Sequence, residues 1–216
     1  MQHANLSQKS QTRNRHGLLS RFMLLLGAVV LSMPLMAATP DPKQAVQEAT
    51  DTLLAKLIEA KPLYEEEPEK FFMEIDSALG PFVDFEGFSR GVMAKYYRRA
   101  TDAQKARFIE TFREGLIETY AKALVEFDNQ KVVVKDPTVD PDRPDRASID
   151  LEIHGQNNKV YPVEYSLVLK DGQWLLRNVM IEGINIGLQF RSQFSSYMQK
   201  YRNDIDEVIA NWSVDV

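Results

Sequence analysis

The sequence predicts an α+β domain in which helices pack on one face of a curved antiparallel sheet. Three changes along the chain support this fold class. Between residues 43 and 127 apolar residues recur every three or four positions, as in amphipathic helices. Between 131 and 182 they alternate with polar residues, as in half-buried strands. The helical period then returns over 187–211, which predicts a single C-terminal helix.

The helical region opens with a helix that ends near Pro62. Its predicted buried stripe consists of Val46, Ala49, Leu53, Leu57 and Ile58. A second helix begins after Pro68 and ends at Gly80, because Pro81 cannot continue it. Its predicted buried residues are Phe72, Ile75 and Leu79.

Two further helices begin at recognisable caps. Asp84 is a candidate N-cap for a short helix whose buried residues are predicted to be Phe88, Val92 and Tyr96. Thr101 and Gln104 have the spacing of a capping box, in which each residue satisfies a backbone N–H of the other. They predict a long central helix that runs to Phe127.

The sheet is predicted to be an antiparallel meander. Apolar residues alternate with polar ones over 147–153 and again over 161–169, so each strand has one apolar and one wet face. The pair Asp171-Gly172 is a hairpin signal before a third strand that starts at Trp174. The stretch 137–144, which contains Pro137, Pro141 and Pro144, is predicted to be rich in turns.

The first 38 residues are predicted to be a cleaved signal peptide. Four Lys or Arg residues precede an apolar run from Phe22 to Leu31, and the small pair Ala37-Ala38 follows. The apolar run is too short for a typical membrane span. We therefore expect export to the periplasm and a mature domain of residues 39–216.

The charge of the mature domain argues against a nucleic-acid partner. Four of the 26 Lys and Arg lie in residues 1–38, which contain no Asp or Glu. The mature domain therefore has 22 basic and 31 acidic residues, and its net charge is −9. A negative field of this kind opposes sequence-independent binding to phosphate backbones.

The residue inventory excludes several catalytic chemistries. There is no cysteine, and the mature part has one histidine, His154, so a zinc site of His and Cys ligands cannot form. The ten glycines form neither of the common phosphate-binding motifs. We predict no catalytic residue, no metal and no cofactor, and we expect His154 to be an exposed structural residue.

Eleven Phe, eight Tyr and eight Met supply much apolar side-chain surface. Apolar stripes of this kind can fill a core or line a cavity for an apolar ligand. The residues alone leave these two interpretations open.

Two segments resemble the MlaC family of periplasmic phospholipid-binding proteins. They are FEGFSRGVMAKYYRRATDAQKARFIETF, from Phe85 to Phe112, and VMIEGINIGLQFRSQF, from Val179 to Phe194. The similarity extends over nearly the whole mature chain. One departure is Ala94, which stands where the family usually has glycine.

The resemblance implies an NTF2-like curved sheet with an added helical subdomain, which holds phospholipid tails in an apolar cavity and leaves the head group exposed. It implies a carrier that needs no cofactor and maintains outer-membrane lipid asymmetry, and we expect the carrier to be a monomer. Its implied partners are an outer-membrane lipoprotein–porin complex and an inner-membrane ABC transporter complex with an MCE component.

The candidate lipid-binding residues follow from this implied cavity and from the apolar faces. The acyl-chain candidates are Tyr97, Phe108, Phe112, Leu116, Tyr120, Ile149, Leu151, Val163, Tyr165, Leu167, Val179, Ile181 and Ile184. The head-group candidates are Arg90, Arg98, Arg99 and Arg191, because arginine offers a fork of donors to phosphate oxygens. Alternation alone predicts that Leu167→Glu keeps the fold and loses the lipid.

Two alternatives remain open at this point. An NTF2-like enzyme acting on an apolar small molecule would need a buried acid or base, such as Asp150 pointing into the cavity. A protein-binding adaptor would have a filled core and no extractable ligand.

Overall fold

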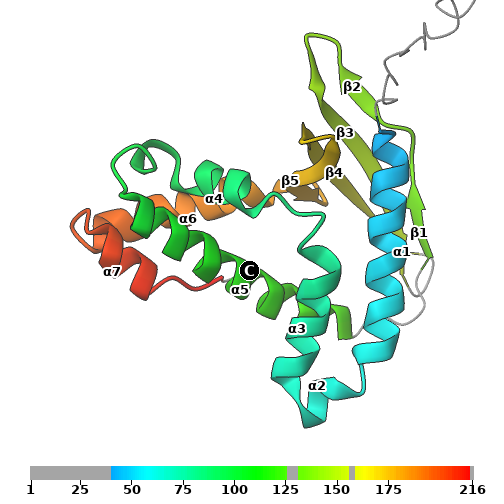
Figure 1. Ribbon diagram of the computed structural model, residues 1–216, viewed down its shortest axis with the longest axis horizontal. Coiled ribbons are helices and arrows are strands. Elements are labelled where there is room, and N and C mark those ends of the chain that lie inside the picture. The colour runs from blue at the N-terminus through cyan, green and yellow to red at the C-terminus, as the bar shows by residue number, and fades with distance from the viewer. Residues whose placement is uncertain (1–39, 126–130, 156–158, 215–216) are drawn as a thin grey trace, which may run out of the picture. The chain divides into compact units, whose positions relative to one another are not determined.

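The computed structural model describes residues 40–125, 131–155 and 159–214; the predicted signal peptide, 1–38, and the predicted helix end at Phe127 lie outside these ranges. In chain order its elements are α1 (Pro42–Ala60), α2 (Leu63–Glu66), α3 (Pro68–Leu79), α4 (Phe85–Met93), the 3₁₀ helix η1 (Ala94–Tyr96), α5 (Asp102–Val125), β1 (Lys131–Val134), β2 (Thr138–Asp140), β3 (Arg143–His154), β4 (Val160–Lys170), β5 (Gln173–Ile181), β6 (Ile184–Asn185), α6 (Ile186–Lys200) and α7 (Ile205–Ala210). The predicted α+β class is confirmed (Figure 1).

The strands form one antiparallel sheet in the order β1-β3-β4-β5-β6, and β2 pairs with the start of β3. The hairpin predicted at Asp171-Gly172 is confirmed, since both residues have positive φ, 52° and 79°. Such turns match the right-handed twist of the adjoining strands. The stretch predicted to be turn-rich, 137–144, also contains the short strand Thr138–Asp140 and the first residues of β3, which begins at Arg143.

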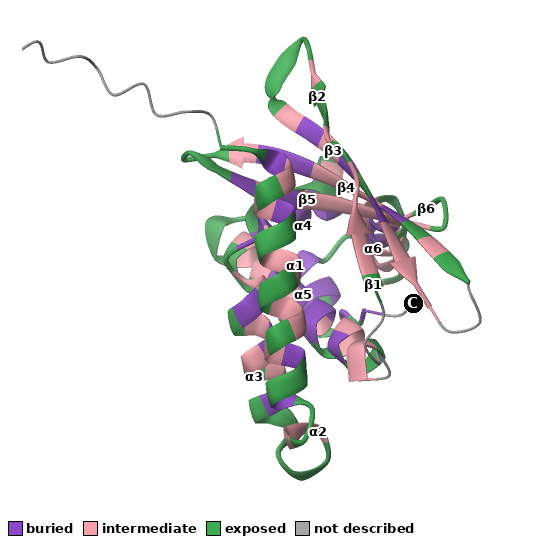
Figure 2. Cartoon of the chain, turned by 90° about the vertical axis from the view of Figure 1, so that its right-hand side faces the viewer, coloured by how far each residue is buried: buried purple, intermediate pink, exposed green. Residues whose placement is uncertain are grey.

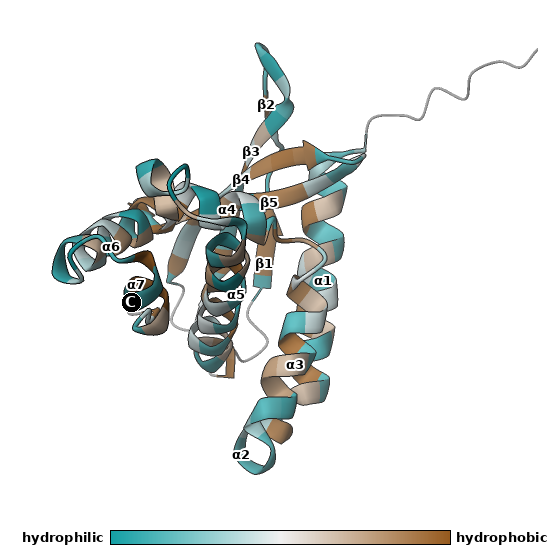
Figure 3. Cartoon of the chain, turned by 60° about the vertical axis from the view of Figure 1, so that its left-hand side comes forward, coloured by the Kyte–Doolittle hydropathy of each residue, from teal (hydrophilic) through white to brown (hydrophobic). Residues whose placement is uncertain are grey.

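The alternation predicted for the strands is borne out by burial. Ala147, Ile149 and Leu151 are buried on the inner face, whereas Asp150 on the same strand is exposed. The inner face packs against α1, which contacts β1, β3 and β5 and also lies along α3. Figure 2 shows buried and exposed segments interleaved along both α1 and the strands, and hydrophobic parts of the strands are brown in Figure 3.

Two of the predicted helix stripes need correction. In α1, Leu57 is buried but Ile58 is 67% exposed, because the next residue is turned about 100° around the helix axis. In α3, Ile75 is buried as predicted. The other buried residues are Phe71 and Ala78, each one position before the predicted Phe72 and Leu79. The last two are partly buried and pack at the side of the core.

The helix capped by Asp84 is shorter than predicted. The Asp84 carboxylate accepts from the N–H of Gly87 at 3.1 Å, which confirms the cap. The helix ends at Met93 because Ala94 has φ 48°, and Tyr96 lies in the following 3₁₀ turn. Positive φ is unfavourable for any residue with a Cβ, which explains why glycine suits this position.

We therefore expect Ala94→Gly to raise the free energy of unfolding by about 1 kcal/mol. Urea denaturation of both proteins measures this difference. The matched control is Ala103→Gly in the exposed first turn of α5, which should instead lower stability by as much as about 1 kcal/mol. An equal loss in the two variants would show that Ala94 is not strained.

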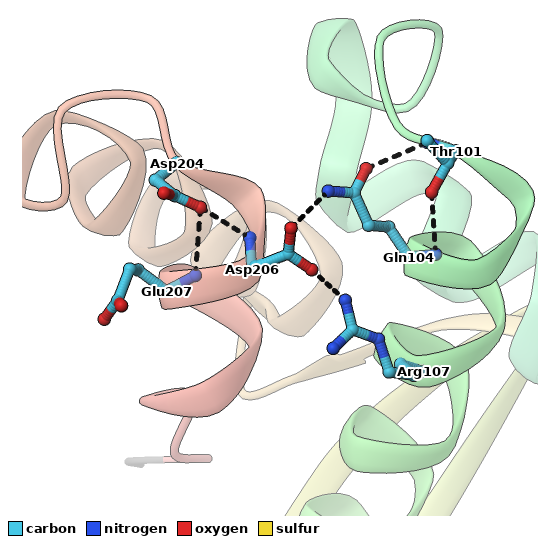
Figure 4. A network of polar contacts seen from close by, with 6 residues as sticks. All are labelled: Thr101, Gln104, Arg107, Asp204, Asp206 and Glu207. Atoms are coloured by element: carbon cyan, nitrogen blue, oxygen red, sulfur yellow. Dashed lines mark hydrogen bonds and ion pairs between the residues drawn. The ribbon is translucent and has the colours of Figure 1, made fainter.

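The capping box at the start of α5 is confirmed (Figure 4). The Thr101 N–H donates to Gln104 Oε1 at 2.9 Å, and the Gln104 N–H donates to Thr101 Oγ1 at 3.2 Å. Gln104 also donates to Asp206 at 2.8 Å, and Arg107 forms an ion pair with the same carboxylate. These contacts attach α7 to the beginning of α5.

The prediction of a single C-terminal helix over 187–211 was wrong, because the chain forms α6 and α7 with a turn between them. Arg202 and Asn203 in the turn have φ of 55° and 65°. The Asp204 carboxylate then accepts from the N–H groups of Asp206 and Glu207, at 3.0 and 3.2 Å, and so caps α7. The break allows Trp212, beyond α7, to pack on Phe108 of α5.

Candidate functional site

Two separate apolar cores meet in this fold. The sheet core contains Ile149, Leu167 and Trp174 together with Val46 of α1. The helical core is built from α3, α4, α5, α6, α7 and the end of α1, with an aromatic cluster around Phe112. Any apolar site between the helical layer and the sheet must lie where these two cores adjoin.

Three partly buried apolar side chains pack against both cores: Val83, Val179 and Ile181. Val179 is the cross-strand partner of Tyr165, which is also partly buried, and Ile181 is the partner of Val163. We call Val83, Tyr165, Val179 and Ile181 the inter-core zone. It is an apolar strip of the inner sheet face, with its adjoining loop, that neither core covers completely.

The long helix α5 packs mainly against other helices. Within the described residues the main contacts of α5 are with α3, α4 and α7, whereas α1 contacts β1, β3 and β5. The long helix therefore lies mainly within the helical layer.

The electrostatics of this region are those of an apolar site. Burial raises the pKa of the Tyr165 phenol, and burial likewise raises the pKa of Tyr120 on α5. The Tyr120 hydroxyl is buried and has no hydrogen-bond partner among the described residues. Both phenols thus stay protonated at neutral pH, and their shifts are opposite to what a catalytic base needs.

The carboxylates of the strands lie on the other face of the sheet. Asp150 pairs across the strands with Glu164, and both line an outer groove with Lys135. The enzyme alternative requires Asp150 to point toward the inter-core zone. Asp150 instead lies on the opposite face of the sheet. His154 lies near Glu152 at the end of β3, with a side chain 40% exposed.

The acyl-chain candidates fall into four groups. Tyr165, Val179 and Ile181 form most of the inter-core zone. The buried sheet core contains Ile149, Leu151, Val163 and Leu167. The helical core contains Phe108, Phe112 and Leu116, with Tyr97 and Tyr120 packed at its side. Ile184 pairs with Ile181 but is 59% exposed, so it lies at the rim of the inner face.

Phe108 and Phe112 lie inside a filled aromatic cluster. Their rings stack 5.7 Å apart, and Phe194 and Trp212 approach Phe108 edge-on at 4.9 and 5.2 Å. Phe88 approaches Phe112 in the same way at 5.2 Å. These positions are typical of core side chains, which anchor α5 and α6 to each other.

The head-group candidates separate into two pairs. Arg90 of α4 and Arg191 of α6 line one groove, which we call the α4–α6 groove. Arg98 and Arg99 are exposed in the turn before α5. The structure therefore brings together only the first pair.

Sequence reasoning missed Arg177, which also lines the α4–α6 groove. It forms an ion pair with the buried carboxylate of Asp84, which is 4% exposed. Burial by itself would raise the pKa of Asp84, but the Gly87 N–H and the charges of Arg177 and Lys170 outweigh it and lower that pKa. Arg177 follows Leu176 at a break in the strand register, so alternation could not place its side chain.

Within the ranges that the structure describes, no three His, Asp or Glu side chains are grouped so that they could hold a metal ion. The helices in those ranges are all too short or too polar to cross a membrane.

The fold and this site define an α+β protein with an apolar zone between two cores and no charged side chain among the residues that form it. The family model described as the MlaC protein matches residues 47–214. The chain is 41% identical over 203 residues to the toluene tolerance protein ttg2D of Pseudomonas putida, covering 92% of this chain and 91% of that protein. It belongs to the MlaC family.

Two more distant similarities accompany this match. The intermembrane phospholipid transport system binding protein MlaC of Haemophilus influenzae is 23% identical over 167 residues, with 75% of this chain and 76% of that protein covered. A phospholipid-binding protein from Ralstonia solanacearum, solved with a phospholipid, has a TM-score of 0.71 and 23% identity, covering 79% and 94% of the two chains. The second similarity supports the fold.

Proposed function

We propose that this protein is a periplasmic phospholipid carrier that holds acyl chains in the inter-core zone and leaves the head group exposed. The observation that carries the proposal is an apolar, incompletely covered strip between two cores in a member of the MlaC family. Relatives of the chain are named for phospholipid binding and intermembrane phospholipid transport. Each methylene group moved from water into such a zone contributes about 0.8 kcal/mol.

The acyl chains are proposed to contact Tyr165, Val179 and Ile181 first, since these side chains are apolar and still accessible. Tyr120 and Leu116 of α5 would close the site from the helical side, and Ile184 would lie at its rim. The other acyl-chain candidates support these residues from within the two cores. For Arg98 and Arg99 the head-group role stays a prediction.

The wider role is proposed from the family. The carrier would be a monomer, exported by the signal peptide 1–38. It would move lipid between an outer-membrane lipoprotein–porin complex and an inner-membrane ABC transporter complex with an MCE component, and so maintain lipid asymmetry. It would need no cofactor, since transfer of an intact lipid makes and breaks no covalent bond.

Catalysis is not part of this proposal. The orientation of Asp150 toward the outer groove and the raised pKa values of Tyr120 and Tyr165 favour a binding role over proton transfer. The single buried carboxylate among the described residues, that of Asp84, is used in an ion pair with Arg177.

A vesicle assay tests the carrier against both alternatives. Donor vesicles contain a self-quenched fluorescent phospholipid, acceptor vesicles contain none, and the protein is purified from the periplasm without detergent. We expect dequenching whose rate rises with protein concentration, and recovery of chemically intact lipid. Hydrolysed or isomerised lipid would favour the enzyme, and no transfer at any protein concentration would favour the adaptor.

A further inference from the structure

The α4–α6 groove is a second surface feature of this protein, separate from the inter-core zone. Its volume is about 380 Å³, and it lies where α4 and α6 meet at β5. Asn178 lines it and pairs across the strands with Ser166, whereas the next residue, Val179, belongs to the inter-core zone. The groove and the zone therefore lie on opposite sides of β5.

The charged side chains that line the groove are all positive. Arg90, Arg177 and Arg191 line it, and none of its lining residues is acidic. Within the described ranges Arg90 and Arg191 form no ion pair. Arg177 forms an ion pair with Asp84, which does not itself line the groove. Two uncompensated guanidinium groups thus face one groove in a mature chain whose net charge is −9.

The walls of the groove are held in place by hydrogen bonds. The Asn178 side chain accepts from the Gly187 N–H at 2.9 Å and donates to Asn185 Oδ1 at 3.1 Å. A Cβ on Gly187 would overlap with the Asn178 side chain, so glycine permits this close approach of α6 to β5. An ordered groove loses little conformational entropy when it binds.

An apolar contact point lies next to the arginines. Leu188, at the first turn of α6, lines the groove and is 55% exposed. A second depression continues from Leu188 and Arg191 along α6 over Ser192, Ser195 and Gln199, so the concave surface is elongated and open. Its shape suits an extended segment better than a single ion.

We propose that the α4–α6 groove is a docking site for an acidic segment of a partner protein. Carboxylates of that segment pair with Arg90 and Arg191, and an apolar side chain packs on Leu188. Arginine is well suited to this role because its planar group binds carboxylates in a bidentate manner. The negative charge of the rest of the chain repels such a segment elsewhere and so orients the partner at this groove.

The test uses a short labelled peptide of repeated Glu-Glu-Leu units and the same peptide with Gln in place of Glu. Binding is measured by fluorescence anisotropy at low salt and mapped by amide NMR. We expect the acidic peptide to shift the resonances of Gly187 and Leu188, and the double variant Arg90→Glu/Arg191→Glu to bind it at least about tenfold more weakly. The Gln peptide should bind the unmodified protein as weakly as the acidic peptide binds the double variant.

The matched control is Lys61→Glu/Arg202→Glu, which changes the net charge equally at two exposed cations outside the groove. This control should keep most of the affinity. An equal loss in both double variants would mean that net charge alone governs binding and would overturn the proposal. If the charge reversal prevents folding, Arg90→Gln/Arg191→Gln is compared with Lys61→Gln/Arg202→Gln, which changes the net charge equally.

Two further outcomes separate this proposal from the proposed lipid carriage, on which it does not depend. Vesicles containing anionic phospholipid should not shift the Gly187 and Leu188 resonances. If the vesicles shift these resonances more than the acidic peptide does, the groove binds lipid surfaces and the proposal is overturned. Lipid content is measured in the same variants. Loss of bound lipid on reversal of Arg90 and Arg191 would place them at the head group and overturn the docking role while leaving the carrier intact.

Discussion

Replacement of Val179 by glutamate is expected to remove bound phospholipid from a protein that still folds. Val179 is partly buried and contacts both cores, so its replacement does not open the centre of either one. A carboxylate there would have to lose its water when acyl chains cover it. That cost is at least about 3 kcal/mol, which lowers the affinity for lipid by about a hundredfold or more.

The matched control is Met180→Glu, one residue further along β5. Met180 lies on the outer face, opposite Glu164 and in the same groove as Lys135, so its glutamate stays in contact with water, where the repulsion from Glu164 is screened. Native mass spectrometry should show a lipid adduct for this control and none for Val179→Glu. Equal lipid adducts in two folded variants would exclude the inter-core zone as the acyl site.

Leu167→Glu is expected to prevent folding rather than to empty the site. Leu167 is 1% exposed in the sheet core, between Ala147 on β3 and Leu176 on β5. A buried carboxylate without a partner costs more than about 4 kcal/mol, a large part of the stability of a typical domain. The burial of Leu167 therefore argues against the prediction from alternation that this variant folds.

Circular dichroism with thermal melting tests this expectation. The control is Leu167→Met, which conserves volume and should lower the free energy of unfolding by less than about 1.5 kcal/mol. A cooperative transition of Leu167→Glu close to that of the unmodified protein would show that the sheet core tolerates charge and that the inner face is more open than its burial indicates.

Much of the fold could be predicted because local signals agreed with tertiary packing. The capping box at Thr101 and the turn at Asp171-Gly172 are contained within a few residues, and both are confirmed. The break between α6 and α7 could not be predicted in the same way. Arg202 and Asn203 adopt positive φ although neither is glycine, and apolar residues continue at helical spacing on both sides of the break.

The candidate site was harder to predict than the fold, because periodicity identifies an apolar face but not what covers it. Ile149 and Val179 lie on the same sheet face, yet α1 helps to bury the first while the second stays partly accessible. Which helix covers which part of the sheet depends on long-range packing. For the same reason, Arg90 and Arg191 could not be placed in one groove with Arg177, which follows a shift in strand register.

The most direct test of phospholipid carriage is native mass spectrometry of the mature protein, purified from the periplasm without detergent, followed by organic extraction and identification of the lipid. The proposed function predicts a mass excess that matches stoichiometric diacyl phospholipid. A bare polypeptide mass, with no lipid gained after mixing with phospholipid vesicles, would contradict it and would identify the inter-core zone as ordinary core.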